Sequence, residues 1–153
     1  RKISTPLALK ALTANLVAAR GISVVVLDYI QIIGVDNPSQ NRNNEIAAIS
    51  RTLKMIALDC DVLVFVVSQL NRGVEARSNK RPAMSDLRDS GAVEQDADWI
   101  LMLYRDDYYR EKGETNDGLA EVHIAKARDG ETGTVDMVFI PELTSFETLA
   151  PAI

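Results

Sequence analysis

The run Val24–Leu27, four apolar residues closed by Asp28, constrains this chain more than any other feature. A strand that is apolar on both faces is typical of the middle of a covered sheet, most often a parallel one. Ligands of open α/β sheets bind beyond the carboxyl ends of such strands. An aspartate there can hold Mg²⁺ beside nucleotide phosphates, or it can simply open a turn. The pattern alone favours the turn, so the rest of the chain must decide.

Charge and cysteine content narrow the class of protein. The 153 residues carry a net charge of −5, which argues against a basic coat for non-specific nucleic-acid binding but not against a local basic strip. The single cysteine, Cys60, allows no disulfide within the chain, so we expect a reducing, cytoplasmic location. No apolar run approaches the ~18 residues of a membrane span, and no signal-peptide pattern is present. Because Arg1 is not an initiator methionine, we expect a piece of a longer protein, truncated at its N-terminal side.

Hydrophobic spacing predicts helices and strands in an order typical of an α/β fold. Apolar residues at helical spacing predict one helix that starts at Thr5-Pro6 and ends at Gly21, and a second over Ile46–Ile56. Continuous or alternating apolar runs predict further strands at Val62–Val67, Trp99–Tyr104, Ala120–Lys126, Thr134–Ile140 and Ser145–Thr148. We therefore predict one domain over residues 1–153, a mostly parallel sheet flanked by helices with a C-terminal antiparallel hairpin.

Gln69 follows the second core strand as Asp28 follows the first. If these strands are parallel neighbours, both side chains reach the same crevice. A neutral amide there can hydrogen-bond a γ-phosphate or the water aligned with it. It can also cap loose backbone groups at a strand end, and for Gln69 alone this second role is the commoner one.

Two cationic features could contact phosphates. The segment Gln69–Gly91 holds five Arg or Lys residues against three acidic ones, net +2 in an acidic chain, but no aromatic residues for base stacking. Lys126 and Arg128, two residues apart at the hairpin turn, could project together toward a neighbouring subunit. A solvated charged loop explains the first segment about as well as phosphate binding does. For the hairpin cations, keeping the hairpin soluble is the commoner role. The only histidine, His123, has no Cys or His partner nearby, so we expect packing rather than zinc binding.

Four stretches taken together resemble one family. They are VVVLDYIQII, NEIAAISRTLKMIA, the block from VVSQLNR to EQDAD, and IAKARDGETGTV. Their order and spacing are similar to those of the C-terminal motor domain of DnaB-type replicative DNA helicases, from about Leu7 to Phe146. The resemblance implies a RecA-like fold that works as a homo-hexameric ring with ATP bound between subunits.

The resemblance also implies roles for individual residues. Asp28 would be the Walker B aspartate that acts on Mg²⁺, and Gln69 the γ-phosphate sensor. Lys126 and Arg128 would act in trans on ATP held by the adjacent subunit, with Arg128 as the arginine finger. These four residues are the expected catalytic and nucleotide-binding set.

DNA contacts follow from the same likeness. Arg88, Asp89 and Gly91 fall where the family's central-channel loop grips single-stranded DNA, and Val35–Asn44 falls on another channel-facing loop. A primase and a helicase loader are the expected protein partners, and no membrane is involved. Relatives often carry Glu where this chain has Asp89, which shortens the reach but keeps the acid.

The family's G-x-x-x-x-G-K-[ST] phosphate loop and its catalytic glutamate are absent from these residues. The chain is therefore expected to be either a fragment of a helicase, inactive alone, or a degenerate relative. A RecA-like ATPase that does not unwind DNA, and an inactive module that binds DNA or a helicase ring, stay open as alternatives.

Overall fold

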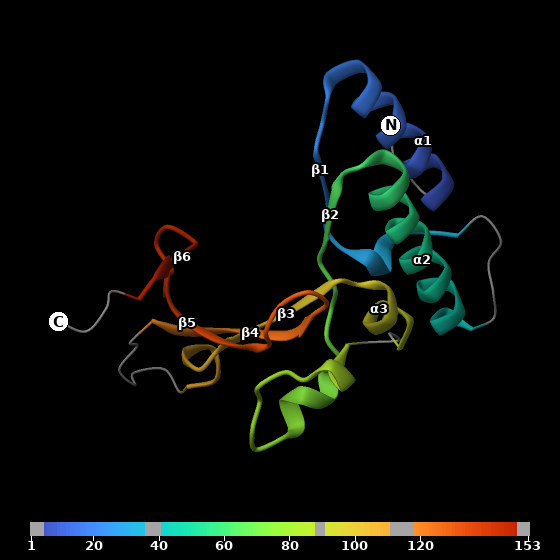
Figure 1. Cartoon of the computed structure of the whole chain (residues 1–153). Coiled ribbons are helices and arrows are strands. Elements are labelled where there is room, and N and C mark those ends of the chain that lie inside the picture. The colour runs from blue at the N-terminus through green and yellow to red at the C-terminus, as the bar shows by residue number, and fades with distance from the viewer. Residues whose placement is uncertain (1–4, 36–40, 88–90, 111–117, 150–153) are drawn as a thin grey trace. The chain divides into compact units, whose positions relative to one another are not determined.

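The computed structural model describes residues 5–35, 41–87, 91–110 and 118–149, which form two compact units (Figure 1). The first unit comprises residues 1–71 and 85–97, and the second comprises residues 72–84 and 98–153. The expectation of a single domain over residues 1–153 stays a prediction. Among the described residues, no helix combines the length and the apolar character needed to cross a bilayer.

The first unit holds the helices and the parallel strands. Its elements, in chain order, are α1 (Pro6–Arg20), β1 (Val24–Leu27), the 3₁₀ turn η1 (Ile30–Ile32), α2 (Arg42–Cys60), β2 (Leu63–Val66), all but the first residue of the 3₁₀ turn η3 (Met84–Asp86), and α3 (Gly91–Asp96). β1 and β2 pair in parallel, with Val24 opposite Leu63 and Leu27 opposite Val66. The prediction that these two strands are parallel neighbours is confirmed.

Helix α1 begins and ends where its capping residues require. The Thr5 hydroxyl accepts a hydrogen bond from the Ala8 N–H at 3.4 Å, and Pro6 occupies the first helical position. Gly21 ends the helix in the left-handed conformation, φ +63°, and its N–H donates to the Val17 carbonyl at 2.8 Å. Both predicted boundaries are confirmed.

The core of the first unit lies between the two long helices and one face of the β1–β2 pair (Figure 1). The apolar stripe predicted for α2 is buried as expected, because residues three or four apart share one face of a helix. The buried apolar members of this core are Leu9, Ile30, Ile46, Ile49, Leu53, Ile56 and Val62. Half-buried strand residues such as Val25 and Val64 pack against them.

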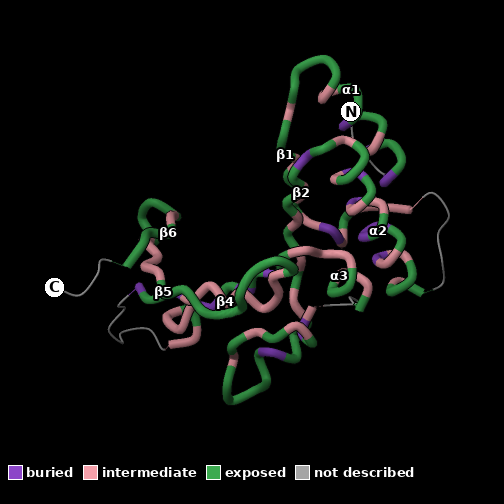
Figure 2. The backbone as a smooth tube through the Cα atoms, viewed as in Figure 1, coloured by how far each residue is buried: buried purple, intermediate pink, exposed green. Residues whose placement is uncertain are grey.

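The other face of the β1–β2 pair is exposed (Figure 2). Val26 is 64% exposed, and its register partner Phe65 is 51% exposed. The expectation that both faces of these strands are covered is therefore wrong for the described residues. Successive strand side chains alternate between faces, and α1 and α2 supply packing partners to one face only.

The second unit is built on an antiparallel sheet. Its elements are the 3₁₀ turn η2 (Arg72–Ala76), β3 (Trp99–Arg105), the 3₁₀ turn η4 (Asp107–Tyr109), β4 (Leu119–Ala127), β5 (Gly133–Ile140) and β6 (Ser145–Thr148). The strand order is β3-β4-β5-β6. The predicted hairpin is confirmed as β4 and β5, and the predicted last strand is confirmed as β6.

Strand β3 alternates between buried and exposed residues. Ile100, Met102 and Tyr104 are buried, whereas Trp99 and Leu101 face solvent. Because β3 pairs with β4 in the antiparallel sheet, parallel pairing among the described strands is limited to β1 and β2. The α/β class with an antiparallel C-terminal extension is confirmed.

Candidate functional site

The carboxyl edge of the β1–β2 pair brings two predicted site residues to one place. The Val67 N–H donates to the Leu27 carbonyl at 2.9 Å, and the Ile30 N–H donates to the Val67 carbonyl at 2.9 Å. This ladder continues the parallel pairing past the ends of both strands. Asp28 and Gln69, which follow β1 and β2, therefore lie at the same edge of the sheet, and both are exposed.

Gln31, which the sequence reasoning missed, ties the two strand ends together. Its side-chain Nε2 donates to the Ser68 hydroxyl at 3.0 Å, and its Oε1 accepts from the Gln69 N–H at 3.3 Å. The signal that could have identified it is a single amide within the apolar stretch YIQII, three residues after Asp28. Gln31 thus holds the backbone of Gln69 at the edge that Asp28 shares.

A second contact holds Gln31 from the side of α2. The Arg42 guanidinium donates to the Gln31 carbonyl at 2.6 Å and lies 2.6 Å from the Glu45 carboxylate. Both Arg42 and Glu45 lie in the first turn of α2. The turn that carries Gln31 is thereby fixed to a helix as well as to the neighbouring strand.

The donor set at this edge fits a magnesium ion that also binds phosphates. Among the described residues no group of three or more His, Cys, Asp or Glu side chains could hold a metal by itself. Mg²⁺ needs no such group, because it is commonly held by one or two carboxylates with waters and substrate phosphates. An exposed carboxylate, Asp28, at the same edge of the sheet as the exposed residue Gln69 meets that requirement.

At the hairpin, Arg128 pairs with Asp98, the residue that precedes β3. Arg128 Nη1 lies 2.8 Å from Asp98 Oδ1, and each side chain is 46% exposed. Lys126 is half-buried in β4 and stands opposite Ile100 in the sheet register. The two hairpin cations are therefore partly accessible, which a role toward another molecule requires; that role stays a prediction.

The predicted DNA contacts fall mostly outside what the structure describes. Arg88 and Asp89 lie outside the described residues, as do residues 36–40 of the Val35–Asn44 loop. Gly91 is the exposed first residue of α3, and a Cβ added there would meet nothing within 4 Å. Packing within the described residues therefore does not require glycine at this position.

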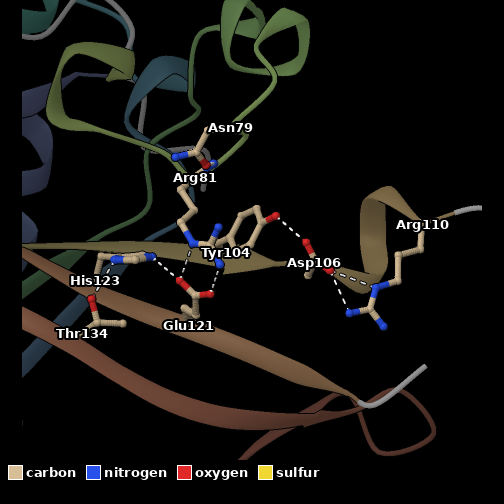
Figure 3. A network of polar contacts seen from close by, with 8 residues as sticks. All are labelled: Asn79, Arg81, Tyr104, Asp106, Arg110, Glu121, His123 and Thr134. Atoms are coloured by element: carbon tan, nitrogen blue, oxygen red, sulfur yellow. Dashed lines mark hydrogen bonds and ion pairs between the residues drawn. The ribbon is translucent and has the colours of Figure 1, made fainter. Parts of the chain in front are cut away.

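A polar network in the second unit was not predicted (Figure 3). The Arg81 guanidinium donates from Nε to Glu121 Oε2 at 2.8 Å and from Nη2 to the other carboxylate oxygen. On the other side of Glu121, His123 Nε2 lies 2.8 Å from Oε2, without the geometry of a hydrogen bond. His123 Nδ1 in turn lies 2.9 Å from the Thr134 hydroxyl. His123 therefore belongs to a polar network, and the expectation of simple packing is wrong.

The contacts of this network, and those between Tyr104 and Asp106 next to it, shift the pKa values of three side chains. The hydrogen bond from Arg81 is the main cause that lowers the pKa of Glu121 below its ordinary value. Burial, followed by the hydrogen bond to Asp106 at 2.7 Å, raises the pKa of Tyr104 to about 12. The Tyr104 hydroxyl and the Arg110 guanidinium together lower the pKa of Asp106. The lowered pKa values of Glu121 and Asp106 keep both carboxylates charged at neutral pH.

Comparison with known proteins then decides the family. Residues 2–148 match the family described as "DnaB-like helicase C terminal domain". The chain belongs to the DnaB-like helicase C-terminal domain family. It is 48% identical over 130 residues to the replicative DNA helicase DnaB of Geobacillus stearothermophilus, covering 84% of this chain and 28% of that protein. The replicative DNA helicase DnaC of Bacillus subtilis gives the same identity and coverage.

Solved structures agree with this membership in the DnaB-like family. A structure described as an ATPase domain superposes with a TM-score of 0.86 at 42% identity, covering 96% of this chain and 52% of that one. A DnaB-like replicative helicase, described together with its interactions with primase, also gives a TM-score of 0.86 at 42% identity, covering 35% of its chain. The present chain thus spans 28% of the length of the curated relatives named above.

Proposed function

We propose that this chain is part of the motor of an ATP-dependent replicative DNA helicase. The motor would translocate on single-stranded DNA as a homo-hexameric ring and hydrolyse ATP at its subunit interfaces. The observation that carries the proposal is the shared sheet edge, where Asp28 and Gln69 follow paired parallel strands and Gln31 holds the backbone of Gln69. Membership of the DnaB-like family, whose named relatives are replicative DNA helicases, supports it.

At this edge Asp28 would hold Mg²⁺ and Gln69 would sense the γ-phosphate. When bound, Mg²⁺ would supply positive charge that stabilises the negative charge developing during phosphoryl transfer. Asp28 supplies an acceptor oxygen to the ion, and Gln69 supplies a neutral amide that can orient the attacking water. No G-x-x-x-x-G-K-[ST] motif occurs in the chain, so these residues form one part of the nucleotide site.

Arg128 would complete the site of an adjacent subunit, with Lys126 beside it. Its half-exposed guanidinium at the end of β4 supports this role, because an arginine finger must reach another molecule. Exposed ion pairs contribute only about 0–1 kcal/mol, so Arg128 could leave Asp98 for a phosphate at small cost. Arginine fingers accelerate phosphoryl transfer by roughly 10³- to 10⁵-fold.

Single-stranded DNA would be gripped by Arg88, Asp89 and Gly91 through phosphate contacts that are largely independent of sequence and sensitive to salt. A primase is a proposed partner, since one structural neighbour is described with its primase interactions. A helicase loader is a second proposed partner, and the proposed location is the cytoplasm.

Substitution of Arg128 tests the proposal. In the intact protein we expect Arg128→Ala to lower DNA-stimulated ATP hydrolysis by at least about 10³-fold while nucleotide binding stays measurable. Arg51→Ala is the matched control, because Arg51 is an exposed arginine on α2 that we assign no role. Fork unwinding is measured alongside hydrolysis. Full residual hydrolysis in Arg128→Ala would refute the role of Arg128.

A mixing experiment tests the action in trans. An Asp28→Asn subunit has a defective site but a normal Arg128, whereas an Arg128→Ala subunit has a normal site and no finger. Rings mixed from the two variants should regain hydrolysis wherever an Arg128→Ala site faces an Asp28→Asn neighbour. Mixed rings as inactive as either variant alone would contradict a finger that acts between subunits.

A further inference from the structure

After Gln69 the chain leaves the first unit and returns to it, and the two ends of this excursion are joined by backbone contacts. Leu70 and Leu87 form an antiparallel bridge, and the Asn71 N–H donates to the Asp86 carbonyl at 2.7 Å. These contacts close the base of the excursion within the first unit. The residues between, Arg72–Met84, belong to the second unit together with the hairpin. We call Arg72–Met84 the strap.

Arg81 attaches the strap to strands β3 and β4 of the antiparallel sheet (Figure 3). Besides its two hydrogen bonds to Glu121 of β4, its guanidinium lies over the Tyr104 ring of β3, 4.6 Å from the centroid. A planar fork that pairs with a carboxylate and stacks on a ring fixes both position and orientation, which lysine cannot reproduce. Arg81 thus contacts two adjacent strands of the sheet.

The strap is shaped around this arginine. The Arg81 N–H donates to Asn79 Oδ1 at 3.0 Å, and the Arg81 carbonyl accepts from Arg77 Nη2 at 3.2 Å. The neighbouring Lys80 ammonium lies 4.6 Å from the centroid of the Tyr109 ring. These contacts restrain the backbone around Arg81, so that a displacement of the strap can reach Glu121 through the Arg81 side chain.

Both ends of this connection lead to residues with proposed roles. The base of the strap follows directly after Gln69, the proposed γ-phosphate sensor. Glu121 lies in β4, the strand that carries Lys126 and leads to Arg128. The cross-strand contact from Glu121 through His123 to Thr134 extends the attachment to β5, so both strands of the hairpin are engaged.

We propose that Arg81 is a positioning residue whose pairing with Glu121 couples the strap, which follows Gln69 in the chain, to the hairpin that carries Lys126 and Arg128. The inference rests on the proposed function. Its consequence is that DNA-dependent movement at the base of the strap changes the placement of Arg128, and with it the rate of ATP hydrolysis. Arg81 contacts neither nucleotide nor DNA in this scheme.

The test breaks the pairing and measures coupling in the intact protein. Glu121→Gln removes the charge of the acceptor, and Arg81→Lys keeps the cation but removes the planar fork. Asp107→Asn is the matched control, because the Asp107 carboxylate is also held by both nitrogens of an arginine fork, at 3.1 and 2.7 Å, but this fork belongs to Arg105 of β3 and not to a residue of the strap. The measurements are ATP turnover with and without saturating oligo-dT, and oligo-dT affinity.

We expect the stimulation by oligo-dT to fall about tenfold in Glu121→Gln and Arg81→Lys. Oligo-dT affinity should stay within about twofold of the parent, and Asp107→Asn should keep the parent's stimulation. Because the two residues would act as one unit, the double variant Arg81→Ala, Glu121→Ala should lose no more of the oligo-dT stimulation than either single alanine variant.

Three results would overturn the inference. They are normal stimulation in both variants, an equal loss in Asp107→Asn, or a loss of oligo-dT affinity that accounts for the lost stimulation. If the parent is not stimulated by oligo-dT, the proposed function fails and this inference fails with it. If Glu121→Gln does not fold, amide hydrogen exchange of the parent decides: β4 amides that change on adding oligo-dT support the coupling, and unchanged ones overturn it.

Discussion

Arg128 and Asp98 contact each other through both side chain and backbone. Arg128 Nη1 lies 2.8 Å from Asp98 Oδ1, and the Arg128 N–H donates to the Asp98 carbonyl at 2.9 Å. The backbone contact fixes where β4 ends relative to the start of β3, whereas the side-chain contact aims the guanidinium. Because the ion pair is half-exposed, it is weak enough that Arg128 can leave Asp98 to contact another molecule.

The first prediction concerns this pair. Asp98→Ala in the intact protein should lower DNA-stimulated ATP turnover by no more than about fivefold, because an exposed ion pair contributes only about 0–1 kcal/mol to the placement of Arg128. The loss should be smaller than for Arg128→Ala, and it should appear in kcat rather than in KM for ATP. Steady-state kinetics on both variants check this. A loss in Asp98→Ala as large as in Arg128→Ala would contradict a purely orienting role.

The second prediction concerns acid stability. The pKa values of Glu121 and Asp106 are lowered in the folded protein, mainly by Arg81 and by Tyr104 with Arg110, respectively. The stability these carboxylates contribute is therefore present above their ordinary pKa values of about 4 and is lost as the pH falls through the lowered folded values. Urea unfolding between neutral and acid pH should show this decline.

Glu121→Gln provides the control for the acid prediction. The variant should be less stable than the parent at neutral pH, and its stability should fall less steeply below about pH 4, because one titrating carboxylate is gone. Parallel stability curves for parent and variant would exclude Glu121 as a source of the acid sensitivity.

The third prediction concerns the core of the first unit. Ile49 of α2 is completely buried in the core of the first unit. Ile49→Ala should lower the free energy of unfolding by about 2–5 kcal/mol, because it removes buried methyl groups and leaves a cavity. The exposed Met55→Ala on the same helix is the control and should change it by less than about 1 kcal/mol. Denaturant unfolding of both variants checks the difference.

The two long helices, α1 and α2, were predictable because their signals are local. The Thr5-Pro6 start, the Gly21 stop and the apolar spacing of α2 each act within a few residues of chain. The strands were predictable as strands, but the covered face was not. A continuous apolar run such as Val24–Leu27 has no alternation from which the packed face could be read, and only the fold assigns Val25 to the core and Val26 to solvent.

The polar contacts were the least predictable part. Arg81 and Glu121 lie 40 residues apart, and Gln31 and Ser68 lie 37 apart. Such partners meet only after the strands have paired in their final register. The residues between them in the sequence therefore do not indicate which side chains will pair. Asp28 and Gln69 could be placed at one edge in advance, because the parallel pairing of two strands is itself enough to bring their carboxyl ends together.

The last prediction follows from Gln31, which joins the two strand ends. Gln31→Ala removes the donor to the Ser68 hydroxyl and the acceptor for the Gln69 N–H, so the backbone of Gln69 loses its fixed position. We expect DNA-stimulated turnover in the intact protein to fall about tenfold, with little change in KM for ATP, since a sensor acts on the reacting water rather than on nucleotide binding. Gln31→Glu is the informative control: it keeps an acceptor for the Gln69 N–H but cannot donate to Ser68. If Gln69 is positioned through its N–H, Gln31→Glu should retain more activity than Gln31→Ala. Equal losses would assign the effect to the lost Nε2 donor, and no loss in either variant would show that Gln31 does not position the proposed sensor.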